Sequence, residues 1–291
     1  MTLSKIAIIG VGLIGGSLGL AFKASDNSPV EITGIDTNQA SLAQALERGA
    51  IDKADTDLTA VADADVVFLC TPVLQISRLA QLVIPHLKQG AILTDTGSSK
   101  LLIKENIRQQ LPQKIYYVGG HPMAGREKSG IAAADKDLFK NKWYILTNVL
   151  DAPAAAVATI SELVQRLGAK VTVMDEEHHD LCAAIISHVP HVAAAALANL
   201  LNFYPGYAEE MLSLAGGGFC DTTRIASSDA DMWADICIAN AEAIASGLEN
   251  FQMLVDGVIS ATREGDRAAL YAYFKEAKLC RDTVLMRNSC P

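Results

Sequence analysis

The sequence predicts an α/β fold in which a doubly wound parallel sheet is followed by an all-α helical domain. Up to Met174, short apolar and β-branched runs alternate with helix-like segments, and this alternation is typical of parallel sheets. From Asp175 onward no strand pattern remains, and the apolar residues recur with a helical period. We therefore expect two domains, residues 1–174 and residues 175–291.

The composition excludes several classes of protein. The 291 residues are 50% hydrophobic and 20% charged, which is enough to build a sizeable core. The net charge of −9 argues against nucleic acid and anionic membranes as partners, because both attract basic surfaces. Six cysteines without a CxxC pair are expected to be reduced thiols. With no signal-like start and no apolar run expected to span a bilayer, the sequence predicts a cytoplasmic protein.

The first predicted strand leads directly into a glycine-rich turn. Residues 5–9 are apolar, the motif G-x-G-x-x-G follows from Gly10 to Gly15, and a helical pattern begins within it. The second predicted strand, residues 31–35, ends in Asp36, about 20 residues beyond the last glycine. In this order the elements indicate a Rossmann-type dinucleotide site; a glycine turn that serves packing alone is the alternative.

Each position of this motif has a physical task. Gly10 permits the tight turn, Gly12 lets the backbone approach a pyrophosphate, and Gly15 lets the helix pack closely. Asp36 is expected to bind the adenosine ribose, and its charge repels a 2′-phosphate, so the sequence predicts NAD as cofactor and not NADP. The predicted cofactor-binding residues are Gly10, Gly12, Leu13, Ile14, Gly15, Asp36, Thr71 and Pro72.

Two later strand ends carry candidate catalytic residues. Further strands are expected at residues 65–70, 91–95, 114–118, 143–147 and 170–174. Ser98 follows one of them, and His121 lies in residues 119–130, a segment so broken by Gly and Pro that we expect a loop. Carboxyl ends of neighbouring parallel strands meet at one edge of a sheet, where open α/β sheets bind ligands. Ser98 and His121 are therefore expected on one rim, although Ser98 or Ser99 could simply cap the next helix.

The second half is expected to be helical throughout. The predicted helices are 176–203, 232–262 and 266–286, with breaks near Pro205 and at residues 216–218. Stretches such as 193–198 are apolar nearly all round and must be buried on more than one face. We therefore expect a homodimer formed through the C-terminal helices.

The first of these helices contains several histidines. Ser187 and His191 are four residues apart and share a face, whereas His188 is expected to point elsewhere. A histidine on an apolar helix is more often a satisfied structural residue than a ligand-binding one. The histidine pair 178–179 together with Cys182 suggests a metal site. Adjacent histidines at an acidic helix start are usually solvated, however, so no metal is predicted.

The segment from Gly216 to Arg224 is expected to be a non-helical connection. Such a connection has a large entropic cost and adds little core, which favours a functional explanation. Arg224 is suited to bind a carboxylate by two parallel hydrogen bonds. An intramolecular ion pair with Asp221 or Asp229 is the alternative.

Together these motifs resemble the prephenate/arogenate dehydrogenase family. The resemblance covers nearly the whole chain and rests on the glycine turn with Asp36, residues 95–100, His121-Pro122-Met123-Ala124-Gly125, residues 187–191, and residues 216–224 followed by Met232-Trp233. It implies NAD-dependent oxidative decarboxylation of prephenate to 4-hydroxyphenylpyruvate, on the route to tyrosine. Arogenate dehydrogenase is the alternative enzyme, and a catalytically idle NAD-binding sensor is an alternative of another class.

The resemblance also implies roles for individual residues. His121, expected near its ordinary pKa, accepts the proton of the ring hydroxyl, and Ser98 hydrogen-bonds that hydroxyl. Arg224 holds the ring carboxylate, with Ser187 and His191 near the substrate.

Three further residues receive roles at the edge of the site. Glu127 regulates access through an ion pair, and Trp233 reaches the neighbouring subunit's site. Cys220 stands where similar sequences tend to carry a basic residue. We hypothesise that Arg126 supplies the missing positive charge to the substrate.

Overall fold

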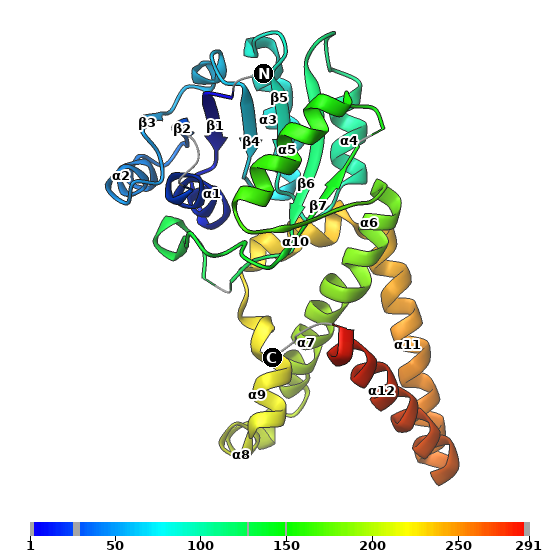
Figure 1. Cartoon of the computed structure of the whole chain (residues 1–291). Helices are drawn as coiled ribbons and strands as arrows, with labels where there is room; N and C mark the ends of the chain where they lie inside the picture. The colour runs from blue at the N-terminus through cyan, green and yellow to red at the C-terminus, as the bar shows by residue number, and fades with distance from the viewer. Residues whose placement is uncertain (1–2, 26–29, 127, 149, 288–291) are drawn as a thin grey trace. The chain divides into compact units, whose positions relative to one another are not determined.

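The computed structural model describes residues 3–25, 30–126, 128–148 and 150–287 (Figure 1). The chain packs as two compact units, Met1–Ala243 and Ile244–Pro291. The first unit contains the whole sheet and the helices up to α10 (Ala230–Ala239). The second contains most of α11 (Ala241–Glu264) and all of α12 (Arg267–Arg287).

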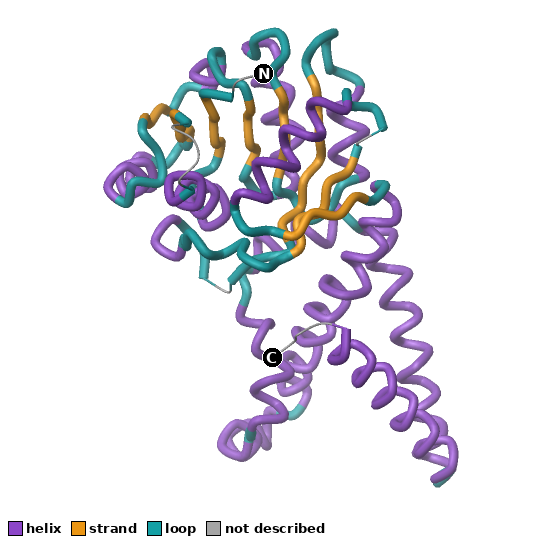
Figure 2. The backbone as a smooth tube through the Cα atoms, viewed as in Figure 1, coloured by secondary structure: helices purple, strands orange, loops and turns teal. Residues whose placement is uncertain are grey.

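An eight-stranded sheet with the order β3-β2-β1-β4-β5-β6-β7-β8 organises the first half (Figure 2). Its strands are β1 (Lys5–Ile9), β2 (Glu31–Ile35), β3 (Lys53–Asp55), β4 (Val66–Leu69), β5 (Ile92–Asp95), β6 (Tyr116–Pro122), β7 (Trp143–Thr147) and β8 (Lys170–Val173). The β6–β7 pair is antiparallel and the other pairs are parallel. The predicted α/β fold is thus confirmed. Strand β3 was not predicted, because its three residues are exposed and lack an apolar pattern.

Helices cover both faces of the sheet (Figure 1). On one face, α1 (Leu13–Ala24), α2 (Gln39–Glu47) and α5 (Ala154–Arg166) bury apolar side chains in a single core cluster with strand residues. On the other, α3 (Val73–Val83) packs against α4 (Leu101–Arg108). Short 3₁₀ turns complete this half: η1 (Leu58–Val61), η2 (Ile84–His86) and η3 (Ile131–Ala133).

Strand β6 extends further than the sequence predicts. The loop expected from residue 119 begins only after Pro122, so His121 lies on the strand itself. Antiparallel pairing with β7 holds the extension, in which His121 lies opposite Ile145. The two glycines allow very close packing: a Cβ atom on Gly120 would lie 2.6 Å from the Asp95 carbonyl oxygen. The glycines that suggested a loop instead let the strand approach its neighbour.

A continuous helical run from Glu176 to Phe203 follows the sheet, as predicted. It consists of α6 (Glu176–Ala183), the π-helical turn η4 (Ala184–His188), α7 (Val189–Asn199) and the 3₁₀ turn η5 (Leu200–Phe203). The π turn precedes Pro190, whose nitrogen cannot donate to the helical ladder. By length and composition the run could cross a membrane, contrary to the sequence-based expectation, but core helices meet the same criteria.

Two expectations for the remaining helices were wrong. The elements are η6 (Pro205–Tyr207), α8 (Ala208–Leu214), α9 (Gly217–Thr223), η7 (Arg224–Ser227) and α10. Residues 217–223 form helix α9 and not a non-helical connection, since packing against α7 offsets the helix cost of each glycine, about 1 kcal/mol. The predicted helix 232–262 is interrupted at Asn240, whose backbone leaves the helical region at φ −124°, ψ 39°.

Candidate active site

The glycine turn between β1 and α1 fits a dinucleotide. Gly10 has φ +90°, and a Cβ atom there would lie 2.6 Å from the Cys70 carbonyl oxygen; one on Gly15 would lie 2.0 Å from the Gly10 carbonyl oxygen. Both positions are therefore closed to side chains by neighbouring backbone. At Gly12 a Cβ atom would meet nothing within 4 Å, so the backbone there is open for a ligand to approach.

Polar groups around this turn also suit a dinucleotide. No side chain caps the start of α1, which leaves its N–H groups for a pyrophosphate, and Leu13 and Ile14 in this first turn are half-buried. The Asp36 carboxylate accepts hydrogen bonds from the backbone N–H of Val11 at 3.0 Å and of Asn38 at 2.9 Å. It holds the turn against the end of β2 and keeps lone pairs for ribose hydroxyls.

The next strand end completes the predicted cofactor edge. Thr71 and Pro72 follow one residue after β4, the neighbour of β1. The Thr71 hydroxyl is buried and has no hydrogen-bond partner among the described residues. Buried hydroxyls are usually hydrogen-bonded, so this group is available to bind the cofactor.

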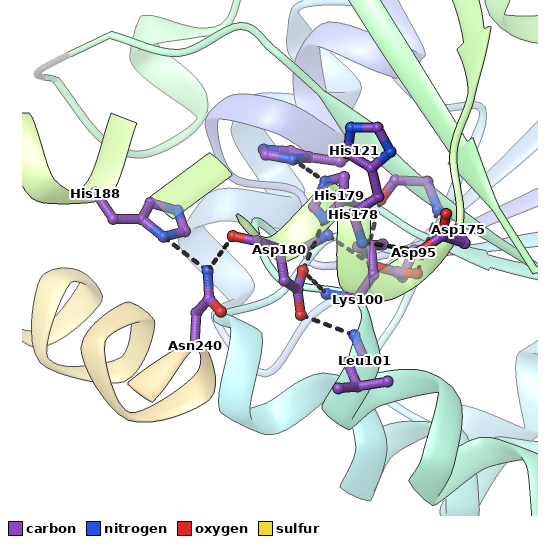
Figure 3. Close-up of polar contacts among 12 residues, drawn as sticks. Asp95, Lys100, Leu101, His121, Asp175, His178, His179, Asp180, His188 and Asn240 are labelled. Atoms are coloured by element: carbon purple, nitrogen blue, oxygen red, sulfur yellow. Dashed lines mark hydrogen bonds and ion pairs between the residues drawn. The ribbon is translucent and has the colours of Figure 1, made fainter. Parts of the chain in front are cut away.

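His121 belongs to a buried chain of three polar side chains (Figure 3). Its Nδ1 lies 2.8 Å from Nε2 of His179, and Nδ1 of His179 lies 2.7 Å from Oδ1 of Asp180. His121 is only 8% exposed and His179 is fully buried. The expectation that histidines 178–179 are solvated was wrong for His179, because the first turns of α6 pack against α4.

Asp180 is fixed by backbone groups of the sheet domain. Its Oδ1 accepts the N–H of Lys100 at 2.7 Å, and its Oδ2 accepts the N–H of Leu101 at 3.0 Å. Asp180 therefore caps α4, and the alternative that Ser98 or Ser99 is the cap was wrong. Both serines follow β5, the parallel neighbour of β6, with Ser98 half-buried.

With both rings neutral, these contacts allow one arrangement of ring protons. A carboxylate only accepts hydrogen bonds, so His179 donates its Nδ1–H to Asp180 and keeps a lone pair on Nε2. That lone pair accepts Nδ1–H of His121. In that arrangement the Nε2 atom of His121 keeps a lone pair and can accept a proton.

The surroundings of His121 keep its ring neutral. Burial is the main cause that holds its pKa well below 6.5, followed by repulsion from His179, Lys100 and His188. The expectation of a pKa near the ordinary value was therefore wrong. The fully buried Lys100 ammonium pairs with the Asp95 carboxylate and donates to the Gly120 carbonyl at 2.8 Å, so a cation supports the strand next to His121.

A second cluster joins α7 to α10. The His191 ring stacks on Trp233 with centroids 3.8 Å apart, and its Nδ1 donates to the Ser187 carbonyl at 3.0 Å. His188, on the same run, meets Trp233 edge-on at 6.0 Å, and burial lowers its pKa to about 4. Asn240 links the two clusters, since its amide nitrogen lies 2.8 Å from the Asp180 carbonyl oxygen and 3.2 Å from Nδ1 of His188 (Figure 3).

The other predicted substrate residues lie at the surface. Arg224 is exposed at the start of η7, which packs against α7. Arg126 forms an ion pair with Asp135 and lines a cavity of about 640 Å³ together with other cationic side chains. The basic residues of this cavity are Arg48, Arg126, Lys128 and Lys136. Glu127 lies outside the described residues.

Sequence reasoning missed four buried polar residues of this region: Lys100, His179, Asp180 and Asn240. A usable signal existed for two of them. Ala183 and Ala184 follow one turn after His179 and Asp180, which places all four on one apolar helical face. Among the described residues, no group of three or more His, Cys, Asp or Glu side chains could hold a metal ion.

The fold and the site define a dinucleotide-dependent dehydrogenase. The model of the prephenate dehydrogenase nucleotide-binding domain matches residues 18–173, and the model of the prephenate dehydrogenase dimerization domain matches residues 175–276. The chain belongs to the prephenate dehydrogenase family.

Individual relatives match this chain over almost its full length. A prephenate dehydrogenase of Bacillus subtilis (strain 168) is 37% identical over 97% of this chain and 76% of that protein. A cyclohexadienyl dehydrogenase of Zymomonas mobilis is 35% identical over 97% of this chain and 96% of that protein. The crystal structure of an Aquifex aeolicus prephenate dehydrogenase with hydroxyphenyl propionate and NAD+ superposes with a TM-score of 0.90 at 31% identity, covering 98% of this chain and 99% of that one.

Proposed function

We propose that this protein is an NAD-dependent prephenate dehydrogenase, which converts prephenate to 4-hydroxyphenylpyruvate and CO2. The observation that carries the proposal is His121, a buried and neutral histidine whose Nε2 is left as a proton acceptor at the carboxyl edge of an NAD-type sheet. The names of the relatives favour prephenate over arogenate as the substrate.

The reaction needs one base and one hydride acceptor, and bound NAD supplies the acceptor. His121 takes the proton of the ring hydroxyl while hydride leaves the same carbon, which becomes a carbonyl. The bond to the ring carboxylate then breaks, its electron pair aromatises the ring, and CO2 departs. The former carbonyl oxygen becomes a phenolate, to which His121 returns the proton. The residues must position the substrate and hold this proton.

Binding roles follow from the surroundings of the two clusters. We assign the ring hydroxyl to Ser98 and His121, the ring carboxylate to Arg224, and the side chain of the substrate to Ser187 and His191. Trp233 stacks on the His191 ring of its own chain, so we assign it to this subsite and not to the neighbouring subunit's site. Glu127 is proposed to regulate access to the substrate through an ion pair, and Arg126 to supply the positive charge absent at Cys220.

Assembly and location complete the proposal. The two domains are residues 1–174 and 175–291, as in the ranges that the two family models match, although residues 175–243 pack in one compact unit with the sheet. The second domain forms a homodimer of a cytoplasmic enzyme. Support comes from the family's dimerization domain and from large apolar side chains that the chain leaves exposed on its helices, among them Phe203 at 80% and Leu214 at 81%. Light scattering that found only monomer at micromolar concentration would contradict the dimer.

The decisive assay measures NADH formation from prephenate and from arogenate in parallel. We expect a higher kcat/KM with prephenate. A higher value with arogenate would replace the proposed substrate, and NAD binding without turnover of either would identify an idle sensor.

A further inference from the structure

We infer that His179 and Asp180 are positioning residues that hold the proton of the reaction behind His121. This inference deepens the proposed function, on which it rests for the step that loads His121 with a proton. In it, the positive charge formed on His121 is stabilised by an Asp180 carboxylate that His121 does not itself contact, with the His179 ring as the connection.

The relay has a defined direction. Asp180 accepts two backbone N–H groups at the start of α4 and a third hydrogen bond from His179, so all these contacts require its oxygens as acceptors. With Nδ1–H of His179 directed at Asp180, only its Nε2 lone pair can meet His121. Proton transfer from Nδ1 of His121 to Nε2 of His179 breaks one N–H bond, forms another, and leaves His121 neutral.

Electrostatics favour this displacement of charge. The titratable groups that repel a charged His121 are His179 on α6, Lys100 before α4 and His188 in η4. A positive charge that stays on His121 remains beside Gly120, where the Lys100 ammonium is bonded. A charge on His179 lies 2.7 Å from a carboxylate oxygen instead, and buried charges need such a partner.

The stoichiometry of the reaction fits a closed relay. The hydroxyl proton leaves before hydride transfer is complete and returns to the phenolate oxygen after CO2 is lost, so no net proton has to reach solvent. The relay is correspondingly shielded, with His179 fully buried and His121 nearly so. Its task is to hold one proton for the time between the two steps.

The test compares His179→Gln with His178→Gln, its exposed neighbour on the same helix. A glutamine at 179 can accept Nδ1–H of His121 but cannot take up its proton. We expect His179→Gln to lower kcat roughly 10- to 100-fold and to shift the acidic limb of the kcat pH profile, with NAD affinity unchanged. His178→Gln should match the wild type in all three measurements. A His179→Gln enzyme within twofold of wild-type kcat and with an unshifted profile would overturn the relay.

A second measurement does not depend on turnover. Nitrogen-15 NMR of the wild-type enzyme with NAD bound should place the ring proton of His121 on Nδ1 and that of His179 on Nδ1. A His121 proton on Nε2 would overturn the relay, even if His179→Gln failed to fold. Absence of prephenate turnover by the wild type would instead reject the proposed function. The positions of the ring protons would still test the geometry of the relay.

Discussion

The two halves of the helical run 176–203 differ sharply in what they bury. In α6 the buried residues include Glu176, His179 and Asp180, whereas in α7 Ala194 alone is buried. Beyond it, Leu200 and Phe203 are 50% and 80% exposed. The first half buries polar groups and the second does not, while both halves expose apolar ones, such as Ile186 at 67% in the first half. Buried polar and exposed apolar groups are the reverse of the usual distribution.

The buried polar groups and the exposed apolar groups are stabilised in different ways. The buried polar groups are hydrogen-bonded to one another and to α4, and they include the histidine that we infer to act as a relay. The exposed apolar groups have no comparable remedy within the described part of the first unit, so we assign them to the dimer interface. We propose that this one continuous run serves catalysis at its start and assembly at its end.

Removal of the base His121, the partner of the first half, should give the largest effect and leave the second half unaffected. His121→Asn keeps a polar side chain but removes the proton acceptor, so we expect kcat to fall 100-fold or more. NAD affinity and the dimer should be preserved. His86→Asn, an exposed histidine in η2, is the matched control and should retain full kcat. Stopped-flow absorbance of NADH measures both, and a fall below tenfold would contradict the assignment.

The burial of His188 should appear as acid sensitivity. Its pKa is about 4 in the folded chain and 6.5 ordinarily, so below pH 6.5 the unfolded state binds the additional proton. Stability is therefore lost as the pH falls from 6.5 towards 4, by roughly 2 to 3 kcal/mol from this residue.

Urea unfolding at pH 7 and pH 4.5 measures the loss. His188→Gln, which retains an acceptor for Asn240, should lose that much less stability between the two pH values. Equal losses in the variant and the wild type would show that another group carries the acid sensitivity.

Charges placed in the second half should act on assembly. Leu200→Asp combined with Phe203→Asp should weaken the dimer roughly 10- to 100-fold, because two carboxylates must be desolvated in each subunit. Sedimentation velocity over a concentration series gives the dissociation constant. Leu46→Asp, at an apolar residue of α2 that is 42% exposed, should leave it unchanged. An unaltered dimer in the double variant would move the interface elsewhere.

The smallest effect concerns Arg126, in the segment after β6. If Arg126 supplies the charge absent at Cys220, Arg126→Ala should raise the KM for prephenate about three- to tenfold with little change in kcat. Lys136→Ala, which removes a charge from the same cavity, is the control and should leave KM unchanged. An unchanged KM in Arg126→Ala would show that the compensation does not exist, in keeping with the ion pair of Arg126 with Asp135.

The difference between what the sequence predicts and what it misses follows from chain distance. The glycine turn and Asp36 contact each other over 25 positions or fewer, and their pattern is local enough to be recognised. His121 and His179 are 58 positions apart, and Asp180 and Lys100 are 80 apart. No local pattern encodes these pairs, because docking of α6 on α4 creates them.

The same reasoning explains the errors in secondary structure. Gly119 and Gly120 are locally typical of a loop, and the close approach of Thr147 to Gly119 and of Asp95 to Gly120 makes them strand residues. The break at Asn240 is equally non-local, since its amide binds the Asp180 carbonyl 60 positions away. Apolar periodicity does not show where a buried amide is needed.

The capping of α4 by Asp180 has a consequence for how the chain folds. A helix usually receives its N-cap from an adjacent residue, but α4 receives it from a side chain 80 positions further along. During synthesis at roughly 5 to 20 residues per second, the residue that caps α4 is therefore made about 4 to 16 seconds after α4 itself. Over that interval the nascent nucleotide-binding domain has an uncapped helix and lacks the partner of His121. The last step of its folding is thus tied to the arrival of the helical domain, so the active site matures only once both parts of the chain exist.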